Sequence, residues 1–354
     1  MSVTIGGVPV GPDTRPFVIA EMSGNHDGSL DKALSIVDAV ARTGAQAVKL
    51  QTYTADTMTL DVDRDEFVID NPQSLWFGRR LHDLYAEAAT PYEWHEPIMA
   101  RAREHGLLCF SSPFDADAVD FLESLDVPCY KIASFENVDH PLIAKAASTG
   151  RPLIISTGIA TIEEVAEAVD VARGAGCTDL VLLKCTSSYP ADPGDSHLRS
   201  IPALAERFGC QVGLSDHTLG IGAAVAAVAL GATVVEKHVT LDRADGGVDA
   251  AFSLEPAELA LLVEESERAR QALGSVRFSP TEAERGAVKR RRSLYLVQDV
   301  RAGDVLTPQN LRSIRPGLGL PPKHYEALLG RRLVADARRG TPMSWELVGG
   351  GPDA

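Results

Sequence analysis

Short apolar runs alternate with longer amphipathic stretches along most of the chain. Each run has the length and composition of a buried β-strand, and a stretch with helical spacing of apolar residues follows it. This alternation predicts a series of β–α units and therefore a parallel sheet. The predicted strands are Phe17–Ala20, Ala47–Leu50, Leu107–Phe110, Cys129–Ile132, Leu153–Ile155, Leu180–Leu183, Val212–Leu214 and Thr233–His238.

The stretch from Ser29 to Thr43 shows the helical pattern most clearly. Its apolar residues recur every three or four positions, and Ser29 precedes them as an N-cap. The other predicted helices are Pro91–His105, Ala116–Leu125, Pro141–Ser148, Ile162–Ala175, Leu198–Phe208, Ile221–Leu230 and Pro256–Leu273. Eight β–α units in about 260 residues fit a (β/α)8 barrel, with a doubly wound open sheet as the alternative.

Polar residues recur at the same end of every predicted strand, which favours the barrel. Active sites of such barrels are assembled at the carboxyl ends of the strands. The polar residues at these ends are Glu21, Lys49, Gln51, Ser111, Ser112, Lys131, Ser134, Glu136, Ser156, Thr157, Thr186, Ser187, Ser215–His217 and Glu236–His238.

The regions outside the repeated units suggest the domain organisation. Val3–Ile5 and Val8–Val10 flank Gly6-Gly7 and predict a small hairpin covering one end of a barrel domain that spans residues 1–274. Residues 52–89 form a long insertion, and residues 275–290 are a polar linker. Residues 291–354 read as a β-rich domain, too short for a second catalytic domain.

Composition narrows the classes of function. The chain has 354 residues, is 45% hydrophobic and carries a net charge of −15, so it can bury a core and is poorly suited to nucleic acids or anionic membranes. Its five cysteines show no C-x-x-C spacing, which favours reduced thiols, and no signal peptide or transmembrane segment is visible. We therefore expect a cytoplasmic protein.

Two of the predicted strands end in histidine. Ser215-Asp-His217 and Glu236-Lys-His238 close consecutive strands, which lie about 4.8 Å apart in a parallel sheet. Two histidines with open positions around them suit a catalytic divalent metal. The alternative is that each histidine is satisfied by backbone groups.

Two lysines on separate strand ends suggest an anion site. Lys49 and Lys131, together with nearby serine hydroxyls, would cradle a phosphate or carboxylate. Structural ion pairs with Glu21 and Glu136 are one alternative, and a Schiff-base lysine in an aldolase is another. An anion site, a Lewis acid and carboxylates together suggest carbon–carbon bond formation between a phosphorylated enol and an aldehyde.

The ordered motifs resemble those of the sialic acid synthase family, and the tail from Arg292 resembles its antifreeze-like (SAF) domain. The resemblance implies a metal-dependent enzyme, usually with Mn²⁺ although Mg²⁺ or Co²⁺ is possible. Such an enzyme condenses phosphoenolpyruvate with an N-acylated amino sugar. The motifs are Glu21-Met-Ser-Gly-Asn-His26, Lys49-Leu-Gln-Thr52, Tyr130-Lys-Ile-Ala-Ser134, Ser156-Thr-Gly158, Gly213-Leu-Ser-Asp-His-Thr218 and Glu236-Lys-His238.

The resemblance also implies residue roles. His217 and His238 would bind the metal, and Glu136 would be the catalytic carboxylate. Arg315 matches an arginine that reaches the partner's barrel, so the resemblance implies a domain-swapped homodimer. Ser187 stands where many relatives have asparagine. Phosphoenolpyruvate would be held by Lys49, Ser112, Lys131, Ser134, Ser156 and Ser215, and the sugar would face Glu21, Gln51, Tyr189 and Asp249.

Within the family the details look most like pseudaminic acid synthases. They include Ser134-Phe-Glu136 and the insertion with Trp76, where Phe135 and Trp76 could contact the methyl group of a 6-deoxy sugar or serve packing alone. N-acetylneuraminate and legionaminate synthases remain the alternatives. A sugar-binding protein led by the tail is the non-enzymatic hypothesis.

Overall fold

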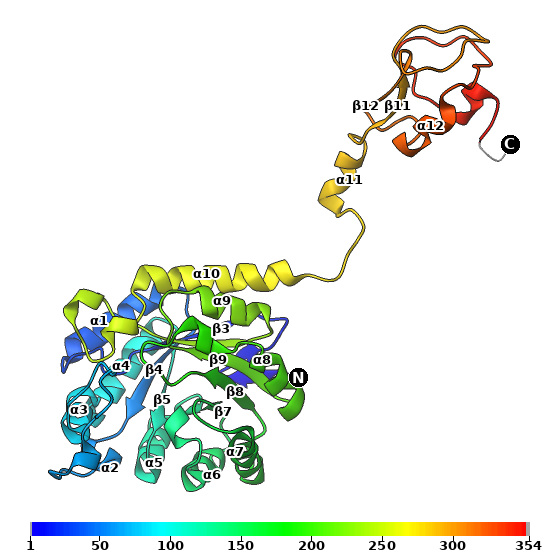
Figure 1. Ribbon diagram of the computed structural model, residues 1–354. Helices are drawn as coiled ribbons and strands as arrows, with labels where there is room; N and C mark the ends of the chain where they lie inside the picture. Colours follow the sequence, from blue (N-terminus) through cyan, green and yellow to red (C-terminus); the bar gives the residue numbers. More distant parts are fainter. Residues whose placement is uncertain (1, 352–354) are drawn as a thin grey trace. The chain divides into compact units, whose positions relative to one another are not determined.

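The computed structural model describes residues 2–351. The chain divides into two compact units, residues 1–274 and 275–354. The first unit holds the β–α repeats and the second the short C-terminal strands (Figure 1). Within the described residues, no helix is long and apolar enough to cross a membrane.

The first unit contains a closed barrel of eight parallel strands, as predicted. The barrel closes because the last strand pairs with the first, with Glu236 opposite Ile19, and this pairing excludes the open sheet. The strands follow one another in chain order around the barrel: β3 Phe17–Glu21, β4 Ala47–Thr52, β5 Leu108–Pro113, β6 Tyr130–Ile132, β7 Leu153–Ser156, β8 Leu180–Cys185, β9 Gln211–Asp216 and β10 Val234–His238.

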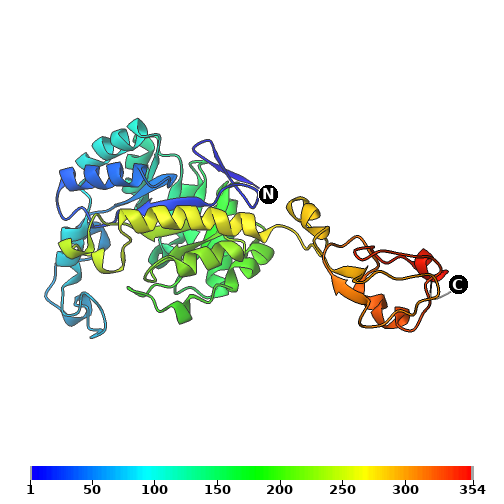
Figure 2. The same ribbon diagram turned by 90° about the horizontal axis from the view of Figure 1, so that it is seen from above.

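Helices surround the strands, as Figures 1 and 2 show for the first unit. The N-cap prediction for the first of them is confirmed, because the Ser29 hydroxyl accepts a hydrogen bond from the backbone N–H of Lys32. The helices that follow the strands are α1 Leu30–Ala41, α4 Tyr92–Glu104, α5 Ala116–Ser124, α6 His140–Ala147, α7 Ile162–Gly174, α8 Ser200–Phe208, α9 Gly222–Ala229 and α10 Pro256–Leu273. Their buried faces and the strands form one apolar core.

Two segments cover opposite ends of this barrel. The predicted hairpin, β1 (Val3–Ile5) with β2 (Val8–Val10), packs at the amino end, where a Cβ on Gly6 would collide with Leu108 and Pro128. The insertion contains α2 (Ala55–Met58) and α3 (Leu81–Ala88). It reaches the carboxyl end, because the Trp76 indole Nε1 donates a 3.1 Å hydrogen bond to the Val248 carbonyl in the loop after β10.

The second unit is small and only partly stranded. Strands β11 (Ser293–Leu296) and β12 (Leu311–Ile314) form an antiparallel pair, and α12 (Tyr325–Leu328) follows. Its own apolar core includes Leu294, Leu296, Val300, Leu306, Leu311, Leu328, Leu333, Met343 and Val348. The predicted linker contains a short helix, α11 (Glu282–Val288), which begins at a capping box between Thr281 and Glu284.

Candidate active site

The carboxyl ends of the barrel strands bring the predicted polar residues together. Strand register sets the neighbours: Glu21 lies opposite Lys49 on β4 and opposite His238 on β10, while Ser215 lies opposite Glu236. Side chains alternate between the two faces of a strand, so Glu236 and His238 share the inner face and Lys237 takes the outer one.

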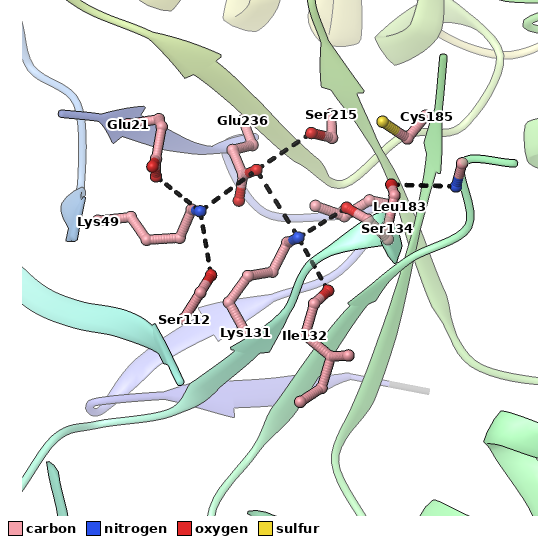
Figure 3. Close-up of polar contacts among 12 residues, drawn as sticks. Glu21, Lys49, Ser112, Lys131, Ile132, Ser134, Leu183, Cys185, Ser215 and Glu236 are labelled. Atoms are coloured by element: carbon pink, nitrogen blue, oxygen red, sulfur yellow. Dashed lines mark hydrogen bonds and ion pairs between the residues drawn. The ribbon is translucent and has the colours of Figure 1, made fainter. Parts of the chain in front are cut away.

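Glu236 lies between the two lysines at the centre of the site (Figure 3). Its Oε1 is 3.7 Å from Lys49 Nζ and 3.8 Å from Lys131 Nζ. The same oxygen accepts a 3.1 Å hydrogen bond from the Ser215 hydroxyl. Glu236 was predicted at a strand end but was assigned no role. Its position two residues before His238 on the same strand could have indicated that its side chain enters the site.

Hydroxyl groups complete the surroundings of the lysines. Lys49 Nζ donates to Ser112 Oγ at 3.3 Å, and Lys131 Nζ donates to Ser156 Oγ at 2.7 Å. Ser134 Oγ accepts from the Gly158 N–H at 3.2 Å. A Cβ on Gly158 would lie 2.6 Å from that oxygen, so the backbone approach requires glycine. The predicted lysine and serine cradle is therefore assembled in space.

Burial and charge set the ionisation of this cluster. Burial lowers the pKa of Lys131. Burial raises the pKa of Glu236, but Lys131 and Lys49 outweigh it and hold the net pKa below its usual range. Burial raises the pKa of Glu21 to about 7, against the lowering effect of Lys49, whose Nζ is 2.6 Å from its Oε2. Gln51 Nε2 donates to the other Glu21 oxygen at 2.9 Å. Near neutral pH, the cluster thus contains the Lys49 ammonium group, the Glu236 carboxylate and a partly protonated Glu21.

His217 and His238 lie side by side, with ring centroids 5.3 Å apart. His217 Nδ1 lies 2.9 Å from the Thr186 carbonyl, to which it can only donate, so in the neutral ring the lone pair lies on Nε2. His238 Nδ1 is buried without a hydrogen-bond partner, and Asp249 Oδ2 lies 3.7 Å from it. The backbone alternative therefore accounts for His217 Nδ1 but leaves a buried nitrogen of His238 unexplained.

These two rings fit a divalent cation that takes its remaining ligands from water or substrate. Burial, followed by the nearby cationic groups, holds the pKa of His238 well below its usual range, and a neutral imidazole is the ligand form. Metal-ligating rings commonly have a carbonyl on the second nitrogen, and the Thr186 carbonyl takes that position on His217. Among the described residues, no group of three or more His, Cys, Asp or Glu side chains has metal-binding geometry. The donor set is that of an open site rather than a closed structural one.

Two further elements border the site. Glu136 lies in the short 3-10 helix after β6, and its buried Oε2 has no hydrogen-bond partner. Burial raises the pKa of Glu136 to about 7. On the other side, the Tyr189 ring lies 4.4 Å from the His217 ring and 5.7 Å from Trp76 (centroid distances).

Most of the predicted residues occupy this site. Ser187 lies beside Gly158, where a Cβ would come within 2.3 Å of its hydroxyl, and Asp249 lies beside His238. Phe135 is 58% exposed. Arg315 belongs to the second unit, on the loop after β12. Cys185, one of the five cysteines predicted to be reduced thiols, lies 3.9 Å from His217 Nδ1.

Comparison with known proteins identifies both units. The profile of the NeuB family matches residues 36–278, and that of the SAF domain matches residues 291–348. Pseudaminic acid synthase from Campylobacter jejuni is 43% identical over 331 residues, covering 93% of this chain and 95% of that protein. N,N'-diacetyllegionaminic acid synthase from Legionella pneumophila is 37% identical over 354 residues, covering 97% and 98%.

A solved structure agrees in fold. N-acetylneuraminic acid synthetase from Leptospira borgpetersenii, crystallised in complex with citrate, superposes with a TM-score of 0.72 at 32% identity. The match covers 81% of this chain and 95% of that one.

Proposed function

Because the chain belongs to the NeuB family, we propose that it is a phosphoenolpyruvate-dependent nonulosonate synthase, and specifically a pseudaminic acid synthase. It would condense phosphoenolpyruvate, 2,4-diacetamido-2,4,6-trideoxy-L-altrose and water into pseudaminic acid and phosphate. The observation that carries the proposal is the pair of lysines around Glu236, directly beside two paired histidines.

The lysine and serine cradle would bind phosphoenolpyruvate. Lys49 and Lys131 supply two positive charges in a buried setting, where their attraction for an anion is much stronger than in water. Glu236 Oε1 lies about equally close to both lysines, so a substrate oxygen that contacts both of them would displace this carboxylate. The hydroxyls that would complete the binding are those of Ser112, Ser134, Ser156, Ser187 and Ser215.

His217 and His238 would hold the divalent metal, most simply Mn²⁺, with Mg²⁺ or Co²⁺ as possible substitutes. Such an ion supplies Lewis acidity toward an aldehyde oxygen. The support is the orphaned Nδ1 of His238 and the carbonyl that orients His217.

The carboxyl groups would take part in proton transfer and in orienting the substrate. In the overall reaction C3 of phosphoenolpyruvate bonds to the aldehyde carbon, a water oxygen adds to C2, and the C2–oxygen bond to phosphate breaks. Glu136, with its pKa near 7 and its unpaired Oε2, would accept the proton from that water. Glu21, Gln51, Tyr189 and Asp249 would face the sugar and orient its aldehyde.

A homodimer is part of the proposal. Of the chain's 34 basic and 49 acidic residues, 14 and 8 lie in residues 275–354, so the C-terminal unit is basic and the barrel is strongly acidic. Opposite charges of this size favour association between the two units of different copies. We propose that Arg315 of one copy reaches the barrel of the other. Sedimentation should give a dimer for the full chain and a monomer for residues 1–274.

The sugar is assigned by likeness to the Campylobacter protein. The indole of Trp76, hydrogen-bonded to the Val248 carbonyl and tilted against the Tyr189 ring, would lie against the end of the sugar remote from its aldehyde. The five free cysteines support a reducing compartment, so we place the reaction in the cytoplasm.

The test is a phosphate-release assay with phosphoenolpyruvate and Mn²⁺. Three sugars are compared: the L-altrose derivative, its legionaminate-pathway counterpart and N-acetylmannosamine. We expect release to be fastest with the first and absent without a sugar. Preference for either of the other sugars would reassign the substrate, while no release with any of them would overturn the proposed reaction.

A further inference from the structure

Lys237 and Asp216 form a buried ion pair behind the two histidines. Lys237 is 0% and Asp216 3% exposed, and Lys237 Nζ lies 2.7 Å from Asp216 Oδ2. They are direct partners in the β9–β10 register. By strand alternation they point away from the inner face that carries Ser215, Glu236 and His238. They therefore belong neither to the anion cradle nor to the pair of imidazoles.

Lys237 contacts the residues that precede and follow His217 in the chain. Its Nζ binds the Asp216 carboxylate and also donates to the Thr218 carbonyl, which are groups of the residues before and after His217. The second oxygen of Asp216 accepts the Thr218 N–H at 2.9 Å. Lys237 itself is the residue before His238. One ammonium group thus joins the backbone that carries one imidazole to the backbone that carries the other.

The stability of the folded state alone does not explain why a buried ion pair is present here. Removing two charges from water costs about as much as their attraction returns, and apolar residues of similar size are often equally or more stabilising. The position of the pair explains its presence better than stability does, because metal affinity depends on fixed ligand spacing. Elsewhere in the barrel unit, the exposed pair Lys145–Asp120 lies between two helices and holds no site residue.

We propose that Lys237, through Asp216 and Thr218, is a positioning residue that fixes the separation of the His217 and His238 rings for a shared divalent cation. The inference rests on the metal assignment made above. It adds a role for an outer-face charge pair that touches neither substrate nor metal.

The test compares Mn²⁺ affinity in the full-length protein and in the double variant Lys237→Met/Asp216→Leu. Free Mn²⁺ is measured by its EPR signal, which requires no turnover. We expect about 10- to 100-fold weaker binding, the range found when groups supporting metal ligands are lost. Phosphoenolpyruvate affinity should change less than threefold, because Lys49 and Lys131 are untouched. The control Lys145→Met/Asp120→Leu should bind Mn²⁺ like wild type.

The possible outcomes separate the two proposals. Absence of Mn²⁺ binding by wild type would overturn the metal assignment and this inference with it. Wild-type affinity in a folded double variant would overturn the inference alone. Equal weakening of Mn²⁺ and phosphoenolpyruvate binding would also overturn it, by indicating general disruption. If the double variant does not fold, Asp216→Asn is measured instead; it keeps the size of the side chain but only one of the two oxygens that accept from Lys237 and Thr218. At least threefold weaker Mn²⁺ binding is expected, and an unchanged affinity would count against the role.

Discussion

Replacing Lys131 by methionine should remove much of the affinity for phosphoenolpyruvate. Methionine preserves most of the apolar stem and removes only the charge, so the change acts on electrostatics. In the structure Lys131 Nζ lies 3.8 Å from the Glu236 oxygen that a bound substrate oxygen would displace. Two unit charges about 4 Å apart attract by about 4 kcal/mol at an effective dielectric constant near 20. At 1.4 kcal/mol for each tenfold change, this predicts a loss of about 10²- to 10³-fold.

The lower end of that range allows for a compensating change at Glu236. Without Lys131, this carboxylate loses the largest of the effects that lower its pKa, so it accepts a proton more readily and repels the incoming anion less. The assay is a direct binding titration with phosphoenolpyruvate, with a thermal melt to establish folding.

The matched control for this experiment is Lys184→Met. Lys184 is a half-buried lysine on the nearby strand β8, and its Nζ donates to the Cys185 carbonyl at 2.7 Å. Its affinity for phosphoenolpyruvate should stay within threefold of wild type. A folded Lys131→Met protein that binds as tightly as wild type would refute the assignment of the anion seat. Trapping of a borohydride-reduced adduct on Lys131 in the wild-type protein would favour a Schiff-base aldolase instead.

Two further predictions concern Glu136 and Gly213. Burial raises the pKa of Glu136 to about 7, and the ionised form is the base, so kcat/KM should rise as pH increases through about 7. Glu136→Gln should lower kcat by about 10²- to 10⁴-fold and abolish that rise; an unchanged acid limb in its pH profile would exclude Glu136 as the base. Gly213→Ala would place a Cβ 2.2 Å from the Val234 carbonyl oxygen, between the strands that carry the histidines. This overpacking should cost about 3 kcal/mol in the free energy of unfolding, measured by denaturant titration, and a variant as stable as wild type would contradict the tight approach of β9 and β10.

The barrel could be predicted because each of its elements is specified locally. Phe17–Glu21 and Val234–His238 are short apolar runs with polar ends, and a run of this kind predicts a strand wherever it occurs. A closed sheet was predicted because the number of β–α units, eight, fits a (β/α)8 barrel. The carboxyl-end rule then placed Lys49, Lys131 and the two histidines in one region before any distance was known.

The partnerships within the site could not be predicted in the same way. Whether Glu136 or Glu236 would lie between the lysines depends on barrel curvature and side-chain direction. The alternative of structural ion pairs named Glu21 and Glu136 as the partners, and of these Glu21 does pair with Lys49. The structure places Glu236 between the lysines. The ion pair between Lys237 and Asp216 was equally hidden, because Lys237 lies among the polar residues of a strand end while strand alternation turns it outward.

The second unit shows a different limit of prediction from the sequence. Its β-rich character was predicted, but besides β11 and β12 part of its pairing consists of isolated bridges, such as that between Val305 and Arg332. The helix α11 was missed although its capping box, Thr281 with Glu284, is visible in the sequence. Polar composition there predicted a linker, and a helix of 7 residues is too short to stand out from such a background.

Pulsed EPR of Mn²⁺ bound to protein containing ¹⁵N-histidine tests the central claim most directly. The two imidazoles whose ring centroids lie 5.3 Å apart should both couple to one ion. We predict coupling from two histidine nitrogens in wild type and from one in His217→Ala or His238→Ala, with phosphoenolpyruvate still bound by each variant. An ion without histidine coupling, or coupling unchanged in both variants, would contradict a shared cation beside the lysine cradle.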